Sequence, residues 1–239
     1  MKQHPTLMQQ AGFSLIEMAV VMVVLGLALG GLLMPLSVQL ENSARKETQA
    51  EMAVIKEALM GFAMANGRLP CPDTTGDGQE NQTLLAPILV CTRTYGDLPS
   101  GTLGVGIDDA WNRPYSYLVS ADFADTTPGT GCGTVPSSGA SFELCSTGNL
   151  RVQDRAGNII AEQLSAVITS HGKHNLVPGR SAFENNNFDT ARVPAPAGSN
   201  LVRIKDNYSE TSGAELDDLI DWLSPAVLQS KMVTAGLLP

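Results

Sequence analysis

The chain has 239 residues, of which 43% are hydrophobic, and its formal net charge is −9 at pH 7. A chain of this length accommodates one globular domain plus an additional element. The acidic balance and the lack of a cluster of Lys and Arg exclude nucleic-acid binding as a main function, because neutralising phosphates requires a basic surface.

An uncharged run, Met18–Val38, consists almost entirely of Leu, Val, Met, Ala and Gly. A helix of about 20 such residues crosses a hydrocarbon core about 30 Å thick, so we predict a membrane span. The run is longer than the apolar region of a cleaved secretory signal, and no Ala-x-Ala directly follows it. Residues 1–12 contain Lys2 and no acid, which predicts a cytoplasmic amino terminus and a head outside the cytoplasm.

Glu17 lies directly before this run. Placing a carboxylate in the hydrocarbon core costs free energy unless a positive group pairs with it, so an acid at this position indicates a function. No Lys or Arg occurs between Lys2 and Arg45, so the same helix offers no partner. A cut between Gly12 and Phe13 would create an α-amino group four residues before Glu17, and this amine could pair with Glu17 of a neighbouring subunit.

The stretch GFSLIE, residues 12–17, resembles the processing site of type IV prepilins and of the pseudopilins of type II secretion. The resemblance implies that a prepilin peptidase cuts after Gly12 and methylates the new amino terminus at Phe13. It implies that Glu17 aligns subunits in a filament. It also implies a single-pass protein of the inner membrane, with its head in the periplasm or in an extracellular filament. The implied partners are the peptidase, other pilin or pseudopilin subunits and an inner-membrane assembly platform, with no nucleic acid among them.

Residues 41–66 predict an amphipathic continuation of the same helix. The apolar residues Met52, Ile55, Leu59 and Phe62 recur at spacings of three and four, with charged residues between them. An Asn-Gly pair and a nearby Pro end the helix. The predicted organisation is a leader at 1–12, a transmembrane and filament-core helix at 13–40, the amphipathic half of the helix at 41–66, and a globular head at 67–239.

The head contains short apolar segments separated by Gly, Pro, Ser, Thr and Asn. We predict strands at Ser116–Val119, Leu150–Gln153, Ala166–Ser170 and Leu201–Lys205, and helices at Ala214–Leu223 and Pro225–Ala235. The predicted fold class is α+β and pilin-like. A long N-terminal helix, transmembrane and then amphipathic, packs on a small antiparallel sheet with long loops and C-terminal helices.

Four cysteines, Cys71, Cys91, Cys132 and Cys145, allow three disulfide pairings, which the sequence alone does not distinguish. We predict the local pairs Cys71–Cys91 and Cys132–Cys145, each stabilising the head by about 2–4 kcal/mol. Disulfides are consistent with a head outside the cytoplasm. A zinc site made of four cysteines is disfavoured, because no Cys-x-x-Cys pair occurs.

The stretch IDDAWNRPYSYLV, residues 107–119, resembles the Asp-Pro-Trp-Gly-x-Pro-Tyr-x-Tyr segment of major pseudopilins. Ala110 stands in place of the Pro and Asn112 in place of the Gly. The resemblance implies that Trp111, Tyr115 and Tyr117 pack the start of the sheet onto the long helix. Strand alternation independently places the two tyrosines on one face.

The resemblance to major pseudopilins also implies a calcium ion near the end of the sheet. The acids that offer hard oxygen ligands in roughly that region are Asp206, Glu210, Asp217 and Asp218. The loop motif does not match, and acids at a helix start are favoured by the helix dipole, so calcium binding and simple capping both stay open. His171 and His174 could hold a metal together, but no third ligand is evident, so we expect them at the surface.

Catalytic motifs are absent from the sequence, which has no G-x-S-x-G, no P-loop and no H-E-x-x-H. We therefore predict a non-enzyme: a structural subunit of a type IV pilus or of a type II secretion pseudopilus. The alternative is a signal-anchored periplasmic binding protein or enzyme with no role in a filament.

Overall fold

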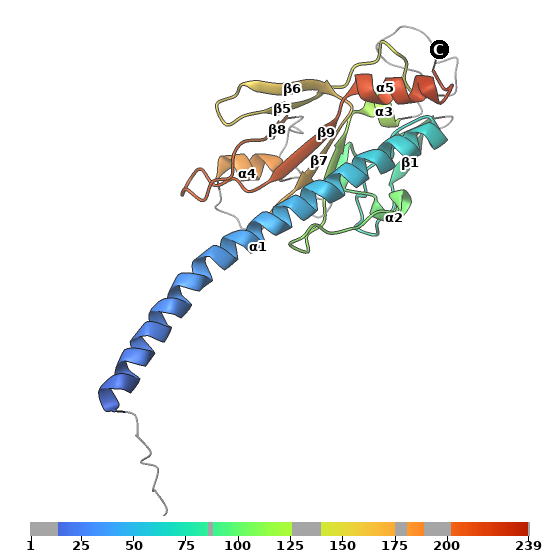
Figure 1. The fold of residues 1–239 in the computed structure, drawn as a ribbon. Coiled ribbons are helices and arrows are strands. Elements are labelled where there is room, and N and C mark those ends of the chain that lie inside the picture. The colour runs from blue at the N-terminus through green and yellow to red at the C-terminus, as the bar shows by residue number, and fades with distance from the viewer. Residues whose placement is uncertain (1–13, 86–87, 126–139, 175–180, 189–201, 239) are drawn as a thin grey trace, which may run out of the picture. The chain divides into compact units, whose positions relative to one another are not determined.

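The computed structural model describes residues 14–85, 88–125, 140–174, 181–188 and 202–238, except the side chains of Leu29 and residues 31–36. The contacts divide the chain into two compact units, Met1–Ser43 and Ala44–Pro239. The helices are α1 (Leu15–Asn66), α2 (Ser100–Leu103), α3 (Ala121–Ala124), α4 (Ala182–Asn187) and α5 (Pro225–Thr234) (Figure 1). The strands are β1 (Gln82–Leu85), β2 (Ile88–Cys91), β3 (Tyr95–Asp97), β4 (Ser116–Val119), β5 (Leu150–Gln153), β6 (Ile159–Leu164), β7 (Ala166–Ser170), β8 (Val202–Ile204) and β9 (Leu219–Leu223).

The N-terminal unit contains the first part of α1. Every residue from 14 to 28 is exposed, and the apolar side chains of Leu15 and Leu27 are 90% and 74% accessible. Within the described residues, no helix combines the length and the apolar character needed to cross a membrane. The predicted span Met18–Val38 includes Leu29 and residues 31–36, whose side chains the structure does not describe.

The C-terminal unit is built on a four-stranded antiparallel sheet with the strand order β3-β4-β7-β9. Successive residues of β7 alternate between two hydrophobic clusters: Ala166 and Ile168 belong to the larger cluster, and Val167 belongs to the smaller one. Because side chains of a strand alternate between its faces, both faces of this sheet are buried.

The later part of α1 covers one face of this sheet and supplies much of the larger cluster (Figure 1). The predicted stripe residues Met52, Ile55 and Leu59 are buried there, because spacings of three and four residues place them on one side of the helix. Each such side chain contributes about 1.5–3 kcal/mol through its removal from water. Phe62, at the end of the stripe, is only partly buried and packs under the guanidinium of Arg68.

The opposite face of the sheet is covered by a three-stranded sheet with the order β6-β5-β8. Leu150, Val152 and Leu164 from this second sheet pack in the smaller cluster. Strand β5 pairs with β6 in the antiparallel direction and with β8 in the parallel direction. The head is therefore α+β as predicted, but its strands do not form one purely antiparallel sheet.

One predicted helix is wrong. Residues Leu219–Leu223, within the predicted helix Ala214–Leu223, form β9 and pair with β7. Leu219 and Leu223 join the larger cluster while Ile220 joins the smaller one. A strand that is apolar on both faces shows the same close spacing of apolar residues as a helix, which explains the error.

The other predicted elements of the head are confirmed. The strands β4, β5 and β7 have the predicted bounds, and β8 lies within the predicted Leu201–Lys205. Helix α5 has Pro225 at its first position, and Gly236 follows it with φ 73°, a conformation that ends helices.

A disulfide and an ion pair fasten the segment that follows α1. Cys71 is bonded to Cys91 at the end of β2, as predicted. Arg68 donates two hydrogen bonds of 2.8 Å to the carboxylate of Glu80, which also accepts one from the backbone N–H of Cys71. Cys145 is also disulfide-bonded, and the partner predicted for it, Cys132, lies outside the described residues.

Candidate functional site

The amino end of α1 is closed by a reciprocal pair of hydrogen bonds. Ser14 directly precedes the helix, and its Oγ accepts a hydrogen bond of 3.3 Å from the backbone N–H of Glu17. The Oε2 of Glu17 in turn accepts one of 3.2 Å from the backbone N–H of Ser14. This is a capping box, which satisfies two donors that a helix otherwise leaves without intrahelical partners. The predicted processing residues Gly12 and Phe13 lie outside the described residues.

Glu17 is a single carboxylate on a helical surface that is otherwise apolar. Its neighbours Leu15, Ile16 and Met18 are all exposed, as is Glu17 itself. A negative charge in the first helical turn is favoured by the helix dipole. The resemblance implied a role for Glu17 in assembly but none in capping, although the spacing Ser-x-x-Glu before an apolar run predicts a capping box.

The aromatic stretch joins β4 to the later part of α1. Tyr115 and Tyr117 are buried in the larger cluster, and the hydroxyl of Tyr115 donates a hydrogen bond of 2.7 Å to Glu51 on α1. Burial, followed by the nearby carboxylate of Glu51, raises the pKa of Tyr115 far above its ordinary value. Trp111 packs against the same cluster but is only partly buried. The implied packing of the sheet onto the helix is thus observed, with the tyrosines as its main contacts.

The turn before β4 is organised by a buried acid. Asp109 accepts hydrogen bonds from the backbone N–H groups of Trp111 and Arg113, and another from the hydroxyl of Ser170. Burial raises the pKa of Asp109 despite these bonds. Asn112, which stands in place of the family's Gly, has φ 58°. This left-handed conformation suits Gly and is tolerated by Asn, which explains the replacement.

The four acids considered for calcium each have a separate partner. Asp206 pairs with Arg155 at 3.1 Å, and Glu210 pairs with Lys173 at 3.4 Å. Within the described part of the chain, no group of three or more potential ligands contains two of these acids. The two remaining contacts are Asp217 with His174, at 2.8 Å, and Asp218 with Asn187, at 2.8 Å. This arrangement does not resemble a calcium cage, which needs six to eight converging oxygens.

The two histidines occupy different environments. His171, expected at the surface, is buried, and its Nε2 lies 2.6 Å from the hydroxyl of Ser116. The side chain of His174 is 26% accessible and lies beside Asp217 and Glu184. Glu184 comes from α4 and was not singled out in the sequence, because only the fold brings α4 next to the segment after β7.

The first comparison with known proteins concerns the amino-terminal region. Residues 7–33 match the family described as the prokaryotic N-terminal methylation motif. The type II secretion system core protein G of Aeromonas hydrophila is 29% identical over 116 residues, which cover 48% of this chain and 77% of that protein. No solved structure gives a significant match.

These findings support the resemblance of GFSLIE to the class of type IV pilin-like proteins. Within that class, the similarity to the core protein G extends well beyond the methylation motif. Both comparisons point to a structural pilin or pseudopilin, and neither points to an enzyme.

Proposed function

We propose that the chain is a structural subunit of a type IV pilus or of a type II secretion pseudopilus, cleaved after Gly12, methylated at Phe13 and assembled through α1. The methylation motif and the similarity to the core protein G support this role. The observation that carries the proposal is the surface of the N-terminal unit. Its described residues from 14 to 28 are all exposed and mostly apolar, so they need cover from lipid or from other subunits.

The same apolar surface of α1 would be used in two stages, first in the membrane and then in the filament. The inner membrane first covers this part of α1, with the head in the periplasm. Neighbouring subunits then cover it when the subunit moves into a filament. A contact between two different faces of identical or similar subunits does not close on itself, and it therefore propagates as a helical filament.

Glu17 would set the register of this assembly. In the free subunit its carboxylate caps the backbone of its own helix. Cleavage after Gly12 leaves a positive amine on Phe13, and a neighbour's amine is a stronger partner than a neutral N–H. A subunit docked one step out of register would leave both charges unpaired in a low dielectric, which is costly.

The first test is mass spectrometry of the amino-terminal peptide, from sheared extracellular filaments and from membranes. The proposal expects a peptide that begins with methylated Phe13. Its presence in the sheared fraction would identify an exported filament subunit. Its presence only in membranes would indicate a subunit of a short pseudopilus or a scarce subunit. A terminus at Met1 in both fractions would contradict the proposal and favour the signal-anchored alternative.

Two substitutions separate processing from assembly. Gly12→Val should leave the leader attached, and a product of mature length would contradict the cleavage site. Glu17→Ala should be processed and inserted normally but should enter filaments poorly. Glu57→Ala is the matched control, because Glu57 is an exposed acid of the same helix within the C-terminal unit.

The similarity to the core protein G favours the secretion pseudopilus over the pilus. Deletion of the chain should then block export of secreted proteins while leaving surface pili in normal number. Loss of pili with unchanged secretion would assign the subunit to a pilus instead.

A further inference from the structure

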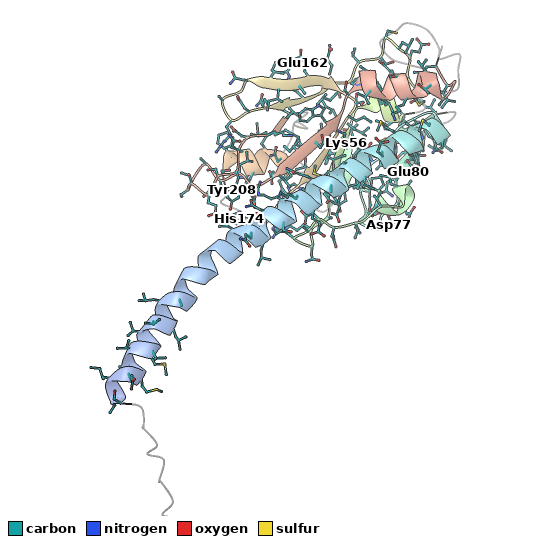
Figure 2. All side chains as sticks on the ribbon, viewed as in Figure 1. Lys56, Asp77, Glu80, Glu162, His174 and Tyr208 are labelled. Atoms are coloured by element: carbon teal, nitrogen blue, oxygen red, sulfur yellow. A yellow bond between two sulfur atoms is a disulfide. The ribbon has the colours of Figure 1, made fainter. Side chains whose placement is uncertain are left out.

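Three potential metal ligands from separate segments meet in the head. His174 follows β7, Glu184 lies in α4, and Asp217 lies shortly before β9. One ligand atom from each of the three lies within 4.8 Å of the other two. The two carboxylates are almost fully buried, with accessibilities of 5% for Glu184 and 1% for Asp217. Figure 2 labels His174, the most accessible member of this His-Glu-Asp cluster.

The Oδ1 oxygen of Asp217 is buried, and no donor among the described residues forms a hydrogen bond with it. The other oxygen, Oδ2, accepts a hydrogen bond of 2.7 Å from the backbone N–H of His174 and lies 2.8 Å from the Nδ1 of the same residue. A buried carboxylate oxygen without a partner costs free energy, and native structures normally satisfy it with a donor, water or an ion.

The backbone is built closely around this carboxylate. Gly172 has φ 59°, and a Cβ at this position would lie 2.9 Å from both Cγ and Oδ2 of Asp217. A larger residue would therefore displace the carboxylate. Gly172 allows the chain after β7 to wrap around the acid and to present His174 to it.

Two arginines bind the backbone of the His-Glu-Asp cluster. Arg113 donates to the carbonyl oxygens of Lys173 and His174, and Arg45 donates to the carbonyl oxygen of Asp217. These contacts fix the loops that carry the ligands.

We propose that His174, Glu184 and Asp217 bind a transition-metal ion of the zinc class. An imidazole nitrogen with two carboxylate oxygens suits zinc and its neighbours, whereas calcium takes oxygen ligands alone. Tetrahedral zinc separates adjacent ligand atoms by about 3.4 Å, so small side-chain rotations would complete the site, with solvent as fourth ligand. The ion would tie α4 and the segment after β7 to the start of β9. Of the acids considered for calcium, only Asp217 belongs to this site.

The test uses the full-length chain, purified without a histidine tag, in detergent and stripped of metal with a chelator. Isothermal titration with zinc chloride should show one ion per chain. Cobalt chloride, used as a spectroscopic probe, should give the visible absorption bands of a low-coordinate site. His174→Ala should weaken zinc binding by at least about 100-fold, more than the loss of an outer-sphere partner costs. Because His174 is partly exposed, this variant should retain the wild-type circular dichroism spectrum.

Control variants separate binding at this site from binding elsewhere on the chain. Glu184→Gln should weaken zinc binding as His174→Ala does, whereas Glu210→Gln should bind like wild type, because Glu210 is exposed and pairs with Lys173. Absence of stoichiometric zinc binding by the folded wild-type chain would overturn the proposal. Equal binding by wild type and His174→Ala would do the same. The proposal would also be overturned if the chain bound calcium in preference to zinc and if Asp206→Asn abolished this calcium binding.

Discussion

The two units of the chain reach stability in opposite ways. The described residues from 14 to 28, in the N-terminal unit, are all exposed although most of them are apolar. The C-terminal unit buries apolar residues on both faces of a central sheet and adds a disulfide and an ion pair. Under the proposed function, lipid or other subunits cover the first unit, whereas the second unit contains its own core.

This contrast predicts where a substitution should be felt. A change in the C-terminal unit should alter the free energy of unfolding of the head, because the lost contact is internal. A change in the N-terminal unit should alter processing or assembly and leave that free energy as it was. Both tryptophans, Trp111 and Trp222, belong to the C-terminal unit, so their fluorescence in denaturant reports on the head.

A matched pair of leucines on α1 should show the contrast most strongly. Leu59→Ala should reduce the free energy of unfolding of the head by about 2–5 kcal/mol, because Leu59 is fully buried and its truncation leaves a cavity. Leu27→Ala removes the same atoms from an exposed side chain, so it should change the free energy of unfolding of the head by less than about 0.5 kcal/mol. Tryptophan fluorescence in a denaturant titration measures both values. Equal effects of the two substitutions would refute the division into a dependent and a self-contained unit.

Removal of the disulfide should rank second. The double substitution Cys71→Ser and Cys91→Ser releases a crosslink between residues 20 positions apart and should cost about 2–4 kcal/mol. The same denaturant titration, with the oxidised wild type as reference, provides the measurement. An unchanged midpoint would show that the crosslink contributes nothing to the head.

A smaller effect is expected from the ion pair of Arg68 with Glu80, and it should depend on pH. Burial raises the pKa of Glu80, but the hydrogen bonds from Arg68 and from the backbone of Cys71 outweigh it and lower the pKa below the ordinary 4.5. The pair should therefore stabilise the head above pH 4.5 and lose its effect as the pH falls through the lowered pKa. Glu80→Gln should cost about 1–3 kcal/mol at neutral pH and much less in acid.

The control for this prediction is Glu162→Gln, at the other labelled glutamate of the head (Figure 2). Glu162 lies 3.9 Å from Arg151, and both side chains are about half exposed. An ion pair at the surface contributes little, so this substitution should change the free energy of unfolding by less than about 1 kcal/mol. Urea titrations between neutral and acidic pH compare the two variants. A difference between wild type and Glu80→Gln that stays constant with pH would contradict the assignment.

The weakest effect on the head should come from Glu17. Glu17→Ala removes the capping box in the N-terminal unit and should leave the free energy of unfolding of the head within about 0.5 kcal/mol of wild type. The same variant is expected to enter filaments poorly, so the two measurements together test the division of roles. A loss of head stability that matched the loss of assembly would contradict it.

Three strands could be predicted because each is a short segment, either apolar or alternating between apolar and polar residues, that is bounded by turn residues. Strands β4, β5 and β7 were predicted with their observed bounds for this reason. Strand β9 could not be predicted, because its residues are apolar toward two clusters and so imitate helical spacing. Strand β6 was missed because most of its residues, including Ile159 and Ile160, are exposed, and its place depends on pairing with β5.

The features that could be read from the chain alone depend on neighbouring residues: the GFSLIE stretch, the capping spacing from Ser14 to Glu17, the apolar stripe of α1 and the end of α5. Local hydrogen bonds and the helical repeat decide these features. Tertiary packing was needed for the placement of the three-stranded sheet on the four-stranded sheet, the parallel pairing of β5 with β8, and the meeting of His174, Glu184 and Asp217. These features join segments far apart in the chain, and their positions follow from the packing of the sheets and helices around one core, which no local pattern contains.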